Sequence, residues 1–364
     1  MNNIKISSTM KNFYRYLAAL TILTALILNT VDVQAGNKDR SGQAGAPELL
    51  VNPWAASTGW GGVNTANARG VESMFCNIAG LSFVNKLELN FNQTYWLKGS
   101  DIGISNFGLG VRAGETGVIG ISVFSMNFGE LDVTTTDQPE GTGATFKPSL
   151  LNFALAYSKT FSNSISAGLT IRIISESIPD ASAQGIAIDA GVMYVTGARE
   201  QAKFGIALRN LGPTMKFTGD GFSIKAFFQG DDYSMSVFQR SESFELPTQL
   251  RIGASYDFYI GEISRLTAAG NFTSNSFSKD QFTLGLEYGL KEYLMLRAGY
   301  TYEDGITAGV DDPARTNAYK GLSLGASIEV PLSRKSDLKL GVDYAYQTTD
   351  NFDGTQVFGV RLKY

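Results

Sequence analysis

Apolar and polar residues alternate along most of this chain from residue 86 onward. In the segment 250–258, Leu250, Ile252 and Tyr256 stand on one face, and polar or small residues lie between them. Strict alternation over several residues is typical of a β-strand with a single apolar face. The pattern predicts about fourteen strands, at 86–97, 100–113, 116–127, 149–161, 164–176, 184–196, 202–210, 247–258, 263–273, 281–289, 293–303, 320–330, 337–347 and 354–364.

The length and the polar face of these strands favour a membrane barrel over a soluble sheet. Most are close to the roughly 9–11 residues that a tilted strand needs to cross a bilayer. In the strand 293–303 the face opposite the apolar one holds Arg297, Gly299 and Thr301. In a wide barrel the apolar face meets lipid and the polar face lines the lumen, and closure pairs every strand edge. We therefore predict an all-β fold, a 14-stranded antiparallel transmembrane β-barrel.

The lengths of the connections support the barrel independently. The long ones, 127–148, 211–246 and 304–319, are the third, seventh and eleventh, whereas the even-numbered ones are short. When both chain ends lie in the periplasm, odd-numbered connections face outward and are the longer ones. A soluble β-sandwich has no reason to follow this rule.

Two of the predicted strands allow a more specific prediction, a β-bulge in one and closure of the barrel by the other. Ile102 and Ile104 are followed out of phase by Phe107, which predicts a β-bulge near Ser105 and Asn106. The last strand, 354–364, has apolar residues at alternate positions and ends on an aromatic residue. It is predicted to pair with the strand 86–97 and close the barrel.

The first 85 residues do not alternate and divide into three parts. Residues 1–35 have a basic start, an apolar run at 16–28 and a small-x-small site ending at Ala35, as in a cleaved secretory signal peptide. The apolar run is short for a membrane anchor, which needs about 20 residues. Residues 36–48 are polar and glycine-rich and predict a flexible segment, and residues 49–85 predict a plug inside the barrel.

Composition removes several function classes. The chain has 364 residues, a net charge of −4, no histidine and one cysteine, Cys76. The commonest general base and metal ligand are therefore missing, and there is no basic surplus for nucleic acid. No catalytic, phosphate-binding or zinc motif occurs. We expect no enzymatic activity, cofactor or metal site, and we interpret Cys76 as a small packing residue. Asp304, Asp311 and Asp312 could offer oxygens to Ca²⁺, but the spacing of a calcium loop is missing, which favours a solvated loop.

The predicted lumen face is rich in charge. Its cations are Arg112, Arg172, Arg209, Arg251, Arg297, Lys339 and Arg361, and its anions are Glu88, Asp189, Asp257, Glu287 and Asp343. They could line a substrate path or form ion pairs that hold the barrel and the plug, and we favour ion pairs. Many small residues on the same face leave room for a plug; they include Gly253, Gly285, Gly299, Gly325 and Gly341.

The stretch WAASTGWGGVNTANARGVESMFCNIAGLSF, residues 54–83, resembles the N-terminal signature of the PorV/PorQ branch of FadL-like outer-membrane proteins. The signature has an A-R-A-x-G-x-G-G-A-like part and, some fifteen residues later, N-P-A-G-L. Residues 54–62 resemble the first part, with departures at Trp54 and Ser57, and residues 77–81 resemble the second, with Ile78 in place of proline. On this resemblance the plug residues are Trp54, Trp60, Asn77 and Gly80.

The resemblance implies a place in the Bacteroidota type IX secretion system. PorV-like barrels bind folded cargo through its C-terminal signal domain and carry it to a surface attachment complex. FadL itself takes up long-chain hydrophobic compounds through a lateral opening. The implied location is the outer membrane, and the implied partners are the translocon and proteins with C-terminal sorting domains.

The loop 211–246 is the candidate docking surface because it is rich in aromatic residues and partly alternates. Its candidate contact residues are Phe222, Phe227, Phe228, Tyr233, Met235 and Phe238. These aromatics could instead pack on one another as a lid over the barrel. We hypothesise a cargo-binding shuttle or accessory subunit of type IX secretion; the alternatives are a FadL-type transporter of hydrophobic small molecules and a static anchor for a surface adhesin.

Overall fold

The computed structural model describes residues 38–227, 233–309, 311–332 and 337–364. The predicted signal peptide, residues 1–35, lies outside the described residues.

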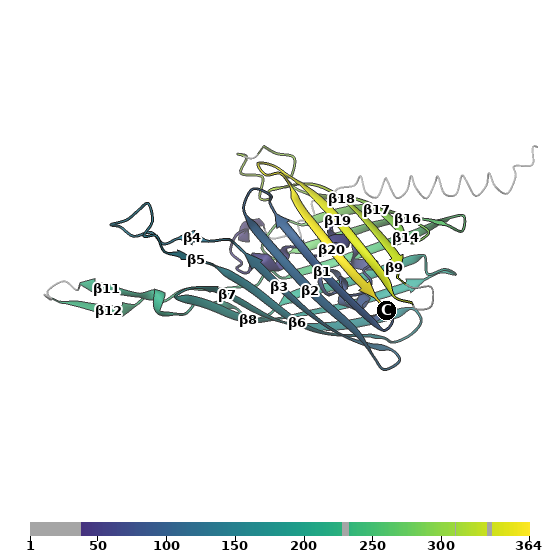
Figure 1. Cartoon of the computed structure of the whole chain (residues 1–364), viewed down its shortest axis with the longest axis horizontal. Helices are drawn as coiled ribbons and strands as arrows, with labels where there is room; N and C mark the ends of the chain where they lie inside the picture. Colours follow the sequence, from purple (N-terminus) through teal and green to yellow (C-terminus); the bar gives the residue numbers. More distant parts are fainter. Residues whose placement is uncertain (1–37, 228–232, 310, 333–336) are drawn as a thin grey trace, which may run out of the picture. The chain divides into compact units, whose positions relative to one another are not determined.

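Fourteen strands form one closed antiparallel barrel, in which each strand pairs with its neighbours along the chain and the last pairs with the first (Figure 1). This confirms the predicted fold and the predicted number of strands. The barrel strands are β1 (Leu87–Trp96), β2 (Ile102–Ala113), β3 (Gly117–Asn127), β6 (Ser149–Thr160), β7 (Ile165–Ile178), β8 (Ala181–Thr196), β9 (Ala202–Leu211), β14 (Gln249–Ile260), β15 (Ser264–Asn275), β16 (Gln281–Leu290), β17 (Leu294–Glu303), β18 (Tyr319–Pro331), β19 (Lys339–Thr349) and β20 (Thr355–Lys363).

The two faces of the wall have opposite chemistry. On β14, Ile252 is 45% exposed on the outside, whereas its neighbour Arg251 is 6% exposed on the lumen side. Apolar side chains outside and polar ones inside are the arrangement that a bilayer requires of a barrel. In the part of the chain that the structure describes, no helix is long and apolar enough to span a membrane.

The barrel closes between β1 and β20, with Glu88 opposite Lys363 and Tyr95 opposite Gln356. The carbonyl of Tyr364 accepts hydrogen bonds from the backbone nitrogens of Lys86 at 2.9 Å and Leu87 at 3.0 Å. The alternating end of the chain is thus the closing strand, as the sequence predicts.

The predicted β-bulge in β2 is wrong. The pairing of β2 with both β1 and β3 runs without a shift past Ser105 and Asn106. Ile104 points into the lumen, fully buried in a cluster with Phe124 and Met126. The change of phase therefore comes from an apolar residue that faces the filled interior.

Two of the three long odd-numbered connections carry small sheets of their own (Figure 1). The third contains β4 (Leu131–Asp132) paired with β5 (Thr145–Phe146). The seventh contains β10 (Met215–Lys216) paired with β13 (Ser243–Phe244) and β11 (Ser223–Phe227) paired with β12 (Ser234–Phe238), with η5 (Asp220–Phe222) before β11.

Short helices make up the N-terminal segment: η1 (Lys38–Arg40), η2 (Pro47–Leu50), α2 (Ala55–Thr58), η3 (Asn64–Ala66), α3 (Ser73–Cys76) and η4 (Ile78–Phe83). They contact lumen-side residues of strands all round the barrel, including β6, β7, β9, β14, β18, β19 and β20. The flexible segment predicted before residue 49 instead has defined contacts, because Ala44 bridges to Glu245 and Glu48 is buried.

Candidate functional site: the filled lumen and the outer hairpin

Glycines of the barrel wall receive the N-terminal segment at very short range. A Cβ added to Gly299 would lie 2.3 Å from the carbonyl group of Trp60, and one added to Gly108 would lie 2.7 Å from the ring of Trp54. Both tryptophans are almost fully buried. Wall glycines thus let bulky groups of residues 49–85 lie directly against the strands.

Asn77 and Gly80 hold the second half of this segment together. Asn77 accepts a hydrogen bond from the Ala79 nitrogen at 3.1 Å, which caps η4. Its amide donates to the carbonyls of Thr65 at 2.8 Å and of Val192 in the wall at 3.0 Å. A Cβ at Gly80 would lie 2.1 Å from the Ala68 carbonyl oxygen, so this position has no room for a side chain.

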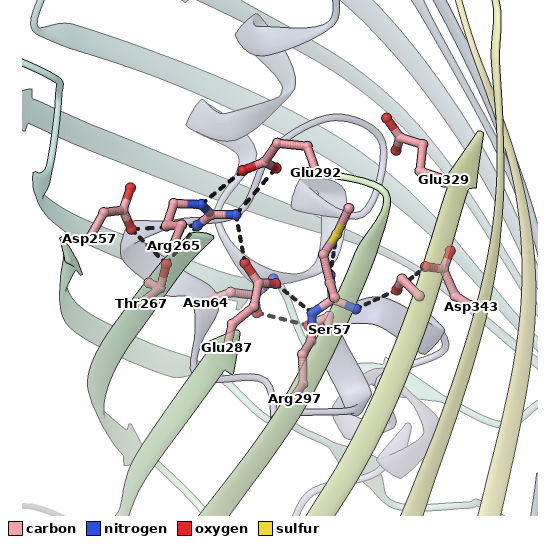
Figure 2. Close-up of polar contacts among 12 residues, drawn as sticks. Ser57, Asn64, Asp257, Arg265, Thr267, Glu287, Glu292, Arg297, Glu329 and Asp343 are labelled. Carbon is pink, nitrogen blue, oxygen red and sulfur yellow. Dashed lines mark hydrogen bonds and ion pairs between the residues drawn. The ribbon is translucent and has the colours of Figure 1, made fainter. Parts of the chain in front are cut away.

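Arg265 is the centre of the first group of lumen charges (Figure 2). It lies 2.9 Å from Glu287, 3.1 Å from Glu292 and 3.6 Å from Asp257. Lys203 approaches the other oxygen of Asp257 at 2.5 Å. These ion pairs link β9, β14, β15 and β16.

The network continues around the wall to the closing strand. Arg297 lies 2.6 Å from Glu287 and also donates to Ser327, which in turn donates to Asp343. Arg361 on β20 then lies 3.0 Å from Asp343. The network thus joins β9 and the strands from β14 to β20 on the lumen side. Arg172 on β7 forms a separate pair with Asp189 on β8 at 2.7 Å.

Two arginines from the predicted lumen set take another role. Arg112 donates to backbone carbonyls of the N-terminal segment, at 2.9 Å to Asn85 and 3.2 Å to Ser82. Arg251 donates to the carbonyl of Gly62. Neither forms an ion pair within the described residues.

Sequence reasoning missed Lys203, Arg265 and Glu329 as members of the network. Lys203 shares the parity of Arg209 on β9, so extending the alternation to the end of that strand would have found it. Arg265 likewise shares the parity of the buried Thr267. Glu329 contacts Lys363 at 2.9 Å and Lys339 at 3.4 Å, and nothing in a single strand indicates that meeting.

Three titratable groups of the N-terminal segment have raised pKa values. Burial, with a further contribution from Glu176, raises the pKa of Glu48 to about 7. Neither oxygen of its carboxylate has a hydrogen-bond partner among the described residues. Burial also raises the pKa of Glu72 to about 7 and raises that of the Cys76 thiol, which contacts the Ser57 hydroxyl at 2.9 Å. Glu48 and Glu72 are thus largely protonated only below neutral pH, whereas Cys76 remains a thiol at neutral pH.

The tip and the base of the loop 211–246 differ. At the tip, on β11, β12 and next to them, Phe227 is 76% exposed and Phe238 59%; Tyr233 and Met235 are exposed as well, and Phe222 is half-buried against Phe238. Phe228, another candidate contact residue, lies outside the described residues. At the base, Phe217 and Phe244 pack over the buried Leu49. The base covers the N-terminal segment, and the tip stands free of it.

Acidic side chains do not gather into a cation site in the described ranges. In the loop 304–319, Asp304 lies 3.6 Å from Lys279, and Asp312 accepts a hydrogen bond from the Ala314 nitrogen at 2.8 Å.

The closed wall, the apolar outer face and the polar lumen define a transmembrane β-barrel of the outer-membrane type. The family model described as "Type IX secretion system membrane protein PorP/SprF" matches residues 107–341. This chain belongs to that family and has an outer-membrane role in type IX secretion. The resemblance to the PorV/PorQ branch is therefore right about the secretion system, but the branch itself is not confirmed. Curated protein sequences gave no match.

Solved structures with the same fold are FadL-like barrels. The CymD monoaromatic hydrocarbon channel superposes with a TM-score of 0.54 at 13% identity, covering 86% of this chain and 97% of its own. The Pseudomonas putida toluene transporter TodX gives 0.52 at 12% identity, covering 86% and 97%. A Pseudomonas aeruginosa FadL homologue gives 0.51 at 14% identity, covering 85% and 98%. At such identities the likeness is one of fold.

Proposed function

We propose that this barrel is a cargo-binding shuttle or accessory subunit of type IX secretion, and that its outer loops bind the C-terminal signal domain of a secreted or surface protein. Family membership supports the system in which it acts. The exposed apolar tip of the β11–β12 hairpin supports the docking surface, and it is the observation that carries the proposal.

The hairpin has two properties of a protein-docking element. Phe227, Met235 and Phe238 expose apolar area away from the lipid-facing wall, and exposed aromatic residues and methionine are enriched at the centre of protein interfaces. β11 and β12 also form a sheet of only two strands. Its outer edges are open in the described part of the chain, so a strand of a β-sandwich partner can add to it.

The N-terminal segment supplies the second part of the proposal, a plug. Residues 49–85 contact the wall on many sides, and the cavity left in the lumen is lined by polar groups that include Arg209, Gln249 and Arg251. Apolar residues such as Leu50 and Phe75 line this cavity as well. A FadL-type path for hydrophobic molecules would have to pass two buried arginines, Arg209 and Arg251, so these charges favour the binding role. A static anchor would use the same hairpin and differ only in how long the partner stays.

The test is affinity purification of the full-length barrel from native membranes. The wild type is expected to recover translocon components or a protein with a C-terminal sorting domain. The triple variant Phe227→Ser, Met235→Ser, Phe238→Ser is expected to recover at least about tenfold less of that partner, because it removes the apolar anchors. Leu131→Ser is the matched control, since Leu131 is an exposed apolar residue of the other outer hairpin.

Equal recovery by the triple variant would refute the hairpin as the docking surface. Recovery of neither class of partner by the wild type would refute the proposed function. A pulse–chase measurement of partner exchange separates the shuttle, which exchanges, from the anchor, which does not.

A further inference from the structure

Two arginines lie side by side on the lumen face. Arg209 on β9 is directly opposite Gln249 on β14, and Arg251 is two residues further along β14 on the same face. Diagonal neighbours of this kind are about 7–8 Å apart at their Cα atoms, within reach of long side chains. Arg209 is 2% exposed and Arg251 6%. Two like charges are thus buried next to each other.

No carboxylate in the described residues pairs with either of them, in contrast to Arg172, Arg265, Arg297 and Arg361. Arg209 donates to the Gln249 side chain at 3.0 Å and to the Leu49 carbonyl at 3.2 Å, and its guanidinium lies 3.8 Å from the centre of the Phe75 ring. The Nε atoms of both arginines have no hydrogen-bond partner among those residues, but the same holds for the paired Arg172 and Arg361, so it is the missing carboxylate that distinguishes Arg209 and Arg251. Buried arginines without a counter-charge are costly, which points to a missing anion.

Two neighbouring titratable groups, Asp189 and Cys76, lie near the arginine pair but do not neutralise its charge. Asp189 acts on Arg209 through space, but it accepts hydrogen bonds from Arg172 and from the Asn210 nitrogen, both at 2.7 Å. Cys76 faces Arg251, yet burial raises the pKa of its thiol, so it is uncharged at neutral pH. The pair therefore keeps its two positive charges.

Both arginines line a lumen cavity of about 400 Å³, the size of a small-molecule site. Residues of outer connections, such as Phe277 and Asn317, also line it, so it is reached from the outer side. Glu303 adds one negative charge to the lining, which leaves one net positive charge among its Asp, Glu, Lys and Arg residues. Trp96 and Phe277 supply aromatic surface, and Asn275 and Gln249 supply amides.

We propose that this cavity binds a small polar organic carboxylate, whose carboxylate is held by Arg209 and Arg251. A planar guanidinium fork matches a carboxylate in two-point geometry. One net positive charge in the lining matches a monoanion, and the amides and aromatic rings match an organic body with polar groups.

The test uses the full-length barrel purified in a non-ionic detergent. The probe is N-acetylphenylalanine, its neutral control is N-acetylphenylalanine amide, and inorganic phosphate and laurate are the other arms. Calorimetry is expected to show that the acid binds and that the amide binds at least about tenfold more weakly. We expect Arg209→Gln and Arg251→Gln each to weaken the binding of the acid by a similar factor. Arg209→Lys is expected to bind the acid more tightly than Arg209→Gln does.

Arg199→Gln is the control variant, because Arg199 is an exposed residue of the turn between β8 and β9. Without ligand, Arg251→Gln is expected to leave the barrel folded by heat-modified gel mobility, since it removes a like charge from the pair. The proposal is overturned if acid and amide bind equally, if only phosphate or only laurate binds, or if no probe binds the folded wild type. The partner experiment above is independent of each of these outcomes.

Discussion

Single atoms decide how the N-terminal segment fits the wall. Gly299 and Gly108 leave space for Trp60 and Trp54, and Gly325 lies so close to Gly59 that a Cβ added to Gly325 would be 2.6 Å from the Cα of Gly59. Real Cβ atoms essentially never lie within 3.0 Å of another heavy atom, so the backbone would have to move. At the residue scale, the segment fits against the wall because these positions are glycines, which carry a hydrogen atom where other residues carry a side chain.

Gly299→Ala is therefore expected to destabilise the barrel. The new methyl group would meet the Trp60 carbonyl at 2.3 Å, and overpacking of this kind costs about 1–3 kcal/mol. Gly270→Ala is the control, since its Cβ would find only the end of Leu284, at 3.5 Å. The measurement is the temperature at which the folded band is lost on heat-modified gels; equal loss for both variants would contradict the close fit.

The raised pKa of Glu48 predicts that the stability of the barrel depends on pH. Its pKa in the folded barrel is about 7, against an ordinary 4.5, so between these values the folded state holds a proton that the unfolded chain releases. The free energy of unfolding is then highest below about pH 4.5 and falls as the pH rises towards 7. At about 1.4 kcal/mol per unit, the loss at pH 8 is on the order of 3 kcal/mol.

The variant Glu48→Gln is uncharged at this position at every pH, so it is expected to lose about half of this dependence; the remainder comes from Glu72, whose pKa is also raised to about 7. Unfolding of wild type and variant at pH 5 and pH 8 measures it, with Glu140→Gln at an exposed loop position as the control. A wild type that is as stable at pH 8 as at pH 5 would show that Glu48 does not carry the effect.

At the scale of elements, the loop 211–246 has two parts with different surroundings, a buried base and an exposed tip. Its base belongs to the core, because Met215 and Leu246 are 1% and 2% exposed and share a cluster with Ala46 and Leu49. Its tip is a hairpin whose ends meet, since the Gln239 nitrogen donates to the Phe222 carbonyl at 2.8 Å. Both interpretations of the loop, a docking surface and a lid, therefore have a physical basis, one for each half.

Replacing residues 223–238 by a short glycine turn is expected to leave the barrel as stable as the wild type and to abolish partner binding. Removing all of 211–246 is expected to lower stability as well, because it uncovers Leu49 and its neighbours. Heat-modified mobility and partner recovery are measured for both. A misfolded short deletion would contradict the division into base and tip.

At the scale of the whole molecule, wall and filling are separate structures. Backbone pairing of the wall runs from strand to strand and closes without the N-terminal segment. The segment instead contributes buried contacts and hydrogen bonds to the lumen side. The lumen of the intact protein should therefore conduct ions poorly.

Deleting residues 49–85 is expected to produce a folded barrel that conducts ions in a planar bilayer. The wall keeps its hydrogen bonds, while the lumen loses its filling and becomes wet. Deleting residues 130–146, an outer hairpin, is the control and should not open a conductance. A folded deletion variant that conducts no better than the wild type would contradict the plug.

Fold and site differ in how far the sequence predicts them. Alternation located all fourteen strands and the closing pair, because side-chain direction in a strand has a period of two. The same rule gave Ile104 a false bulge, since it assumes that every apolar residue faces lipid. The alternation along each strand indicated which charged side chains face the lumen. It could not show which of them form ion pairs, as Arg297 and Arg361 do. Nor could it show that Arg209 and Arg251 have no carboxylate partner among the described residues.

What the sequence by itself determined is the wall: strand number, the direction of each face, the ends that meet and the loops that are long. These follow from local periodicity and from the demand of a bilayer that every backbone group be paired. Only the tertiary structure decided what fills and lines the lumen, because those contacts join different strands or join the N-terminal segment to the wall, as Leu49 and Arg209 do across 160 positions. Their meeting depends on strand register and on the path of a segment without periodicity.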